Sequence, residues 1–124
     1  MASQQQHLQQ LRARGPCPRM NIAEGAAFLR WRAKRHLELL RRWENKAFPT
    51  GDDFVDLASP EIDEPLMREQ FRDLAWILFY EHGPNAHIEC FEFACKLCSH
   101  DSQVLDLVER TCRRTFSGIG NWWT

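Results

Sequence analysis

PLMREQFRDLAWILFYEH, residues 65–82, is the stretch of this chain that decides its fold. Apolar residues recur along it every three or four positions, as they do on the buried face of a helix. These positions are Met67, Phe71, Leu74 and Leu78. Gly83 and Pro84 follow at once and end the helical pattern. The dense apolar second half of the stretch therefore predicts a central helix that supplies much of the core.

An earlier stretch, from Asn21 to about Lys46, predicts a second and longer helix. Asn21 can accept a hydrogen bond at the helix start, and Glu24 lies three residues on, as in a capping box. One apolar stripe runs along the helix and consists of Ile22, Ala26, Leu29, Ala33, Leu37, Leu40 and Trp43. Basic residues fill its other faces, namely Arg30, Arg32, Lys34, Arg35, Arg41, Arg42 and Lys46. The pattern indicates an amphipathic helix with a basic outer side.

Two shorter helices are predicted after the Gly-Pro stop. Asn85 can cap one of them, which runs through AHIECFEFACKLC, residues 86–98. Asp101 or Ser102 can cap the other, and Gly118 closes it. The apolar positions of this last helix are Val104, Leu105, Val108 and Cys112. Since no segment alternates as a strand does and no repeat is visible, we predict an all-α fold, a small bundle of about four helices.

Differences in composition divide the chain into an arm, a helical domain and a tail. Residues 1–19 combine glutamine repeats with the stretch GPCP, whose prolines discourage continuous helix, so we expect a flexible N-terminal arm. Residues 20–118 form the predicted helical domain, which contains an acidic connector at 48–64. Residues 119–124, IGNWWT, form an apolar tail.

Length and composition fit a single intracellular domain, because a chain of 124 residues can bury one core but rarely two. The 44% apolar and 27% charged residues argue against a disordered or a membrane class. The apolar run LAWILFY is far shorter than the roughly 20 residues of a transmembrane segment. The polar N-terminus also lacks a signal-peptide core, so we expect a cytoplasmic or nuclear location, or both.

The near-neutral net charge conceals an asymmetry between the two parts of the chain. Residues 1–48 hold ten Lys and Arg against three Asp and Glu, whereas residues 49–124 hold six against fourteen. A basic amphipathic helix can dock on a partner protein, contact phosphates of nucleic acid, or lie on an anionic membrane. We keep nucleic-acid or anionic-membrane binding through residues 30–46 as an alternative to protein binding. An ordinary bundle helix with a solvated charged face would show the same pattern.

Five tryptophans are more than a core of this size can hide, so some are expected at a binding surface. We therefore predict a partner-binding surface that combines arginines of the basic helix with tryptophans. Its candidate residues are Arg30, Arg35, Arg41, Arg42, Trp31, Trp43, Trp122 and Trp123.

Cysteines and histidines gather in the stretch HIECFEFACKLCSH, residues 87–100. Cys95 and Cys98 have a spacing that zinc sites use, but the chain has no second Cys-x-x-Cys pair. Burial as small apolar side chains is the simpler interpretation, and we predict that the reduced protein folds without a metal cofactor. The alternative is a zinc-stabilised adaptor, with Cys95, Cys98, His100 and Cys90 as the first ligands; Cys112 or His82 could replace Cys90.

The sequence contains no glycine-rich phosphate loop and no nucleophile-elbow pattern, so no catalytic residue is predicted. We expect a non-enzymatic protein-interaction, adaptor or regulatory module. Its partner is expected to be another protein, and homo-oligomerisation stays open.

Two resemblances are visible. CFEFACKLC, followed by a predicted helix and a Trp-containing end, resembles the central hairpin region of apoptosis regulators that bind a helical peptide in a groove. That similarity covers under a third of the chain, and GPNAHIE stands where those proteins carry Asn-Trp-Gly-Arg. A small helical chain rich in Trp, Arg and Cys also resembles viral accessory adaptors in general style.

Overall fold

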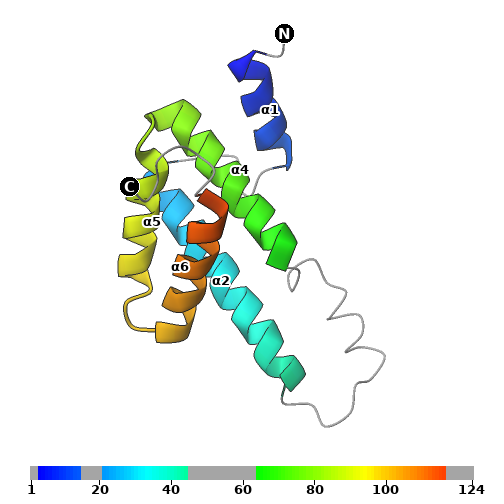
Figure 1. Ribbon diagram of the computed structural model, residues 1–124, viewed down its shortest axis with the longest axis vertical. Coiled ribbons are helices and arrows are strands. Elements are labelled where there is room, and N and C mark those ends of the chain that lie inside the picture. The colour runs from blue at the N-terminus through cyan, green and yellow to red at the C-terminus, as the bar shows by residue number, and fades with distance from the viewer. Residues whose placement is uncertain (1–2, 15–20, 45–63, 117–124) are drawn as a thin grey trace.

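The computed structural model describes residues 3–14, 21–44 and 64–116, and all regular structure in these ranges is helical. Four of its helices are those that the sequence predicts, and a fifth precedes them (Figure 1). The helices are α1 (Gln4–Arg14), α2 (Ile22–Glu44), α4 (Glu64–His82), α5 (Ala86–Leu97) and α6 (Ser102–Phe116). The predicted all-α bundle is confirmed. Most of the connector, Gly118 and the tail at 119–124 lie outside the described residues.

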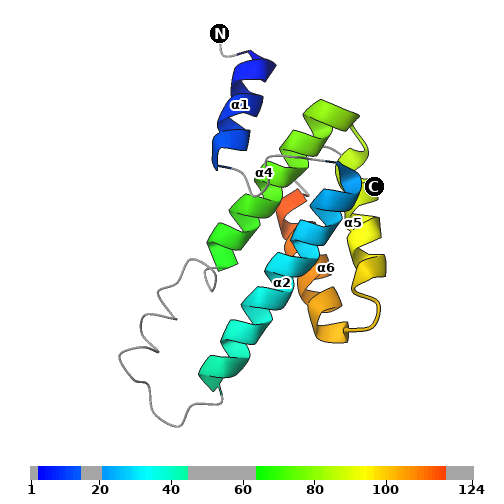
Figure 2. The same cartoon turned by 180° about the vertical axis from the view of Figure 1, so that it is seen from behind.

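The central helix of the bundle is α4, as its apolar pattern predicts. It contacts each of the other four helices, and it runs opposite to α2 in both views of the molecule (Figures 1 and 2). The apolar side chains that it buries are Met67, Phe71, Leu74, Ala75, Ile77 and Leu78. Together with residues of α2, α5 and α6 they form one continuous core. Burial of this apolar area is the main stabilising contribution to the fold.

The capping residues explain where two of the helices begin. The Asn21 side chain accepts a hydrogen bond from the Glu24 backbone N–H at 2.7 Å, and its amide donates to the Glu24 carboxylate at 2.9 Å. The Asp101 carboxylate accepts bonds from the backbone N–H groups of Gln103 and Val104 at the start of α6. Each cap satisfies backbone donors that the first helical turn leaves without partners. These two starts confirm the predictions.

The start of α5 corrects a prediction, because the Asn85 side chain makes no capping hydrogen bond. Instead its backbone carbonyl accepts bonds from the N–H groups of Ile88 and Glu89, both at 3.1 Å. Gly83, at φ 107°, makes the preceding turn in a conformation that only glycine adopts without strain.

The helix α1 lies within the segment that we expected to be an arm. Ser3 and Gln6 form a capping box, in which the Ser3 hydroxyl accepts from the Gln6 backbone N–H at 3.1 Å. Leu11 is buried, and His7 Nδ1 lies 2.8 Å from the Tyr80 hydroxyl. Among the helices described, α1 contacts α4 alone. The Ser-x-x-Gln spacing is the local signal that would have predicted this helix.

The inner face of α2 differs from the stripe that periodicity predicts. Ala26, Leu29 and Ala33 are fully buried as expected, but Arg32, which we placed on the basic side, is only 2% exposed. Its Nε donates to the Gln70 side chain of α4 at 2.9 Å. A buried guanidinium needs such a partner, since an uncompensated buried charge is strongly destabilising. Farther along, Leu37 and Leu40 are only half-buried.

Candidate functional site

The candidate site is the outward face of α2, defined here by Arg30, Trp31, Lys34, Arg35, Glu38, Arg41 and Arg42. Trp31 is 55% exposed. In the described residues, Phe93 is the other large apolar side chain that is exposed, at 41%. Arg30 and Lys34 beside Trp31 are exposed as well. This face therefore presents an aromatic surface among cations, and Glu38 is its one acidic residue.

Trp31 forms a wall shared by two shallow hollows. One has a volume of about 390 Å³ and is lined by Trp31, Lys34, Arg35 and Glu38. The other has a volume of about 340 Å³ and extends from Trp31 past Arg30 to Leu97 at the end of α5. An apolar side chain of a partner could rest against the indole from either side, with cations within reach.

A groove continues the site along α2 toward α6. It has a volume of about 440 Å³, and its lining combines the half-buried Leu37 and Leu40 with Leu107 of α6. The exposed Arg41 and Arg110 also line the groove, as does Asp106. Periodicity assigned both leucines to the core; Leu37 does pack against it, but both leucines also line this opening. This feature was missed because the stripe turns gradually around a long helix.

The predicted partner-binding residues have different outcomes. The structure brings Trp31, Arg30 and Arg35 together, and it places Arg41 and Arg42 farther along the same exposed side of α2. Arg35 lies 3.9 Å from Glu38, an exposed ion pair of little stabilising value. Trp122 and Trp123 lie outside the described residues, and so does the side chain of Trp43. Trp76 is half-buried, and its ring centroid lies 6.3 Å from that of His7 on α1, so it belongs to the contact between α1 and α4.

The cysteines of the cluster lie mainly in the core. Cys90 is 1% exposed and Cys98 2%, whereas Cys95 is half-buried. Burial raises the pKa of Cys90 to about 12 and that of Cys95 to about 11, and it also raises the pKa of Cys98. Because the thiolate is the nucleophile, these shifts disfavour cysteine catalysis near neutral pH. Cys112 is fully buried, and burial raises its pKa well above the ordinary value.

Metal binding was the alternative for this cluster. Within residues 3–14, 21–44 and 64–116, no three His, Cys, Asp or Glu side chains are grouped closely enough to hold a metal ion. His100 is exposed, and Cys90 lies under α2, with its sulfur 3.0 Å from where a Cβ on Gly25 would be. Cys17 lies outside the described part. In the described residues, the cysteines of the cluster pack between helices as small apolar side chains.

Comparison of the chain with protein-family models, with curated proteins and with solved structures gives no match. The two resemblances seen in the sequence therefore carry no further argument. None of the helices in the described ranges has the length and apolar content needed to cross a membrane.

Proposed function

We propose that this protein is a non-enzymatic interaction module whose α2 outward face binds an acidic segment of another protein. The observation that carries the proposal is the exposure of Trp31 between Arg30 and Lys34. Trp and Arg are the residue types most enriched among interface hot spots. Leaving an indole in water without a partner is unfavourable, so its burial by a partner would contribute to affinity.

The chemistry of the face selects the partner. An apolar or aromatic side chain fits against the indole, and carboxylates on either side of it would pair with Arg30, Lys34 and Arg35. The Arg35 pair with Glu38 is long and exposed, so a partner carboxylate can replace Glu38 at little cost. The expected ligand is a short acidic segment with an embedded apolar residue.

The groove beside Leu37 and Leu40 supports a contact longer than one side chain. Arg41 belongs both to the outward face and to the groove, so a bound segment could continue from Trp31 toward α6. Leu107, Leu37 and Leu40 would then receive a second apolar side chain, with Arg41 and Arg110 near its flanking carboxylates.

Binding to nucleic acid or to an anionic membrane through residues 30–46 is the competing proposal. It uses the same cations, but it assigns no specific role to the Trp31 hollows. Phosphate binding also releases counterions, so its affinity falls steeply with salt. A contact anchored on Trp31 would keep a salt-independent apolar component.

Selection from a library of displayed short peptides tests the proposal. Peptides retained by the wild-type protein are expected to combine Asp or Glu with one apolar residue. Trp31→Ala should lower the affinity for these peptides at least roughly tenfold, as truncation of a hot spot does. Fluorescence anisotropy measures this affinity. Phe93→Ala is the matched control, since Phe93 is 41% exposed but lies on α5.

Two results would contradict the proposal. One is equal weakening by Phe93→Ala and Trp31→Ala, which would deny the α2 face any special role. The other is binding of oligonucleotides or anionic vesicles, but of no peptide, with a steep loss of affinity between low and physiological salt. That second result would favour the competing proposal.

A further inference from the structure

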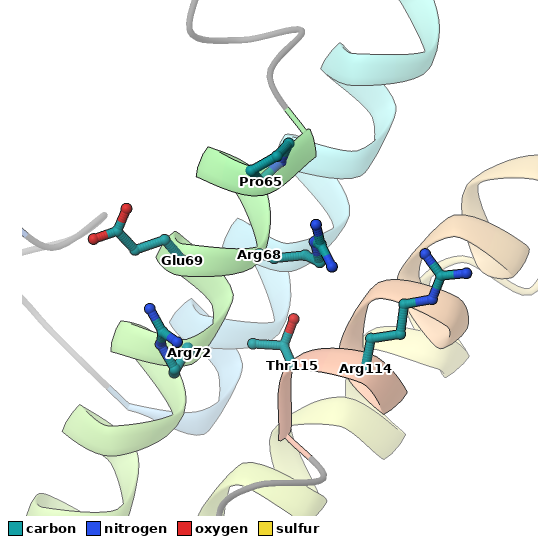
Figure 3. A pocket seen from close by; sticks show the side chains of 6 residues that line it. All are labelled: Pro65, Arg68, Glu69, Arg72, Arg114 and Thr115. Carbon is teal, nitrogen blue, oxygen red and sulfur yellow. The ribbon is translucent and has the colours of Figure 1, made fainter.

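A second basic site lies away from the α2 outward face, where the first turns of α4 approach the end of α6. A pocket of about 270 Å³ opens there between the two helices (Figure 3). Arg68, Glu69 and Arg72 come from α4, and Arg114 and Thr115 come from α6. Residues more than forty positions apart in the sequence therefore line one opening, which no local pattern could have indicated.

Arginines outnumber carboxylates in the lining of this pocket. Its lining holds three arginines and one carboxylate, that of Glu69. Arg68 and Arg72 lie one turn apart on α4, a spacing at which like charges destabilise a helix. Figure 3 shows the Glu69 carboxylate pointing away from the opening between Arg68 and Arg114. The side of the pocket between α4 and α6 thus presents positive charge.

Two hydrogen-bonding atoms in the pocket lining lack partners. Arg68 Nε and Thr115 Oγ1 are buried, and neither has a hydrogen-bond partner in the described part of the chain. An unpaired buried polar atom costs free energy, and a charged donor costs more than a neutral one. In Figure 3 the Thr115 side chain lies below that of Arg68, with its hydroxyl oxygen on the side of Arg68. Both side chains line the opening, so an acceptor bound there can satisfy these atoms once the side chains turn toward it.

We propose that this pocket binds a phosphate-type oxyanion. Arg68 donates from Nε, Thr115 donates from its hydroxyl, and the Arg114 guanidinium supplies further donors and charge. The planar guanidinium matches the spacing of phosphate oxygens and forms bonds stronger than those between neutral groups. The pocket volume leaves room for several waters of about 30 Å³ each, so the anion can keep part of its hydration shell. The anion is either free phosphate or a phosphate monoester carried on a peptide.

The Nε–H resonance of Arg68 in a ¹H–¹⁵N NMR spectrum tests the site directly. Inorganic phosphate, a short phosphoserine peptide and its unphosphorylated form would each be added at constant ionic strength, set with sodium chloride. We expect phosphate to shift the Arg68 resonance in a saturable way. The phosphoserine peptide should bind more tightly than phosphate if the natural ligand is a monoester, and with similar affinity if it is the free anion.

Matched variants separate the pocket from general charge. Arg114→Gln should weaken phosphate binding roughly tenfold, as expected for the loss of a charge-assisted hydrogen bond. Arg113→Gln removes the same charge from the neighbouring exposed position, which does not line the pocket, and should have little effect. Thr115→Val retains the charges but removes the hydroxyl, and should weaken binding by a smaller factor. Far-UV circular dichroism would verify that each variant remains helical.

The proposal is overturned if phosphate leaves the Arg68 resonance unmoved. It is also overturned if the shift does not saturate, or if Arg113→Gln weakens binding as much as Arg114→Gln. Equal binding of the two peptides would likewise deny the phosphate any role. None of these results depends on the α2 outward face, so this site and the proposed function can fail separately.

Discussion

Leu29 and Trp31 stand two residues apart on α2, yet Leu29 is fully buried and Trp31 is 55% exposed. Two residues correspond to about 200° around a helix, so the two side chains point to nearly opposite sides. The inner side, represented by Leu29, packs against α4, α5 and α6 and holds the bundle together. The outer side is exposed at Trp31, and Leu97 of α5 lies beside one of its hollows. One helix thus supplies core residues on one side and leaves a large aromatic side chain exposed on the other, where we propose that a partner binds.

The largest expected difference comes from truncating these two residues. Leu29→Ala should lower the free energy of unfolding by roughly 2–5 kcal/mol, because it removes buried methyl groups and leaves a cavity. Trp31→Ala should change it by no more than about 0.5 kcal/mol, as for an ordinary surface position. Urea unfolding followed by circular dichroism measures both. Similar losses for the two variants would show that Trp31 is part of the core.

A smaller loss of stability is expected from adding a side chain at Gly25, where α2 lies close to its neighbours. A Cβ there would lie 3.0 Å from Cys90 Sγ and 3.4 Å from methyl carbons of Leu74 and Leu78. Gly25→Leu should therefore destabilise the protein by about 1–3 kcal/mol through overpacking. Ala27→Leu adds a large side chain to the exposed side of the same helix and should be nearly neutral. A neutral result for Gly25→Leu would show that α2 does not pack tightly against α4 and α5 at this position.

The stability of the inner side is also expected to depend on alkaline pH, through the buried thiol of Cys90. Burial raises the pKa of Cys90 to about 12, whereas an unfolded cysteine titrates near 8.5. Between these values the unfolded chain loses a proton that the native protein keeps. The contribution of Cys90 is thus complete below pH 8.5 and falls by about 1.4 kcal/mol per pH unit above it, until the folded pKa is reached.

Urea unfolding at several values between pH 8 and pH 11 would measure this decline. The Cys90→Ala variant is the control, because the lysines and the tyrosine titrate in both proteins. The substitution also removes the contribution of Cys90 to the raised pKa of Cys112, which changes the slope in the same direction. The stability of the variant should fall less steeply with pH than that of the wild type. Identical slopes would show that the Cys90 thiol is accessible to solvent in the folded protein.

Much of the helical framework could be predicted because the signals for it are local. Asn21 with Glu24, and Asp101 before α6, are capping patterns that act within a few residues. The pattern of Pro65 to His82 predicts the central helix for the same reason. The Ser3 and Gln6 pair before α1 is an equally local signal, but it stands at the start of a run of glutamines, which obscures it.

The sequence by itself determined the helices, their order and the basic character of α2, since periodicity and charge are written along the chain. Only the tertiary structure decided which basic residues are exposed. Arg30 and Arg32 look equivalent in the sequence, but Gln70 of α4 pairs with Arg32 in the interior and leaves Arg30 outside. The pocket between Arg68 and Arg114 likewise exists only because α4 and α6 pack together. The physical reason is that burial depends on contacts between distant segments, and local preferences do not specify those contacts.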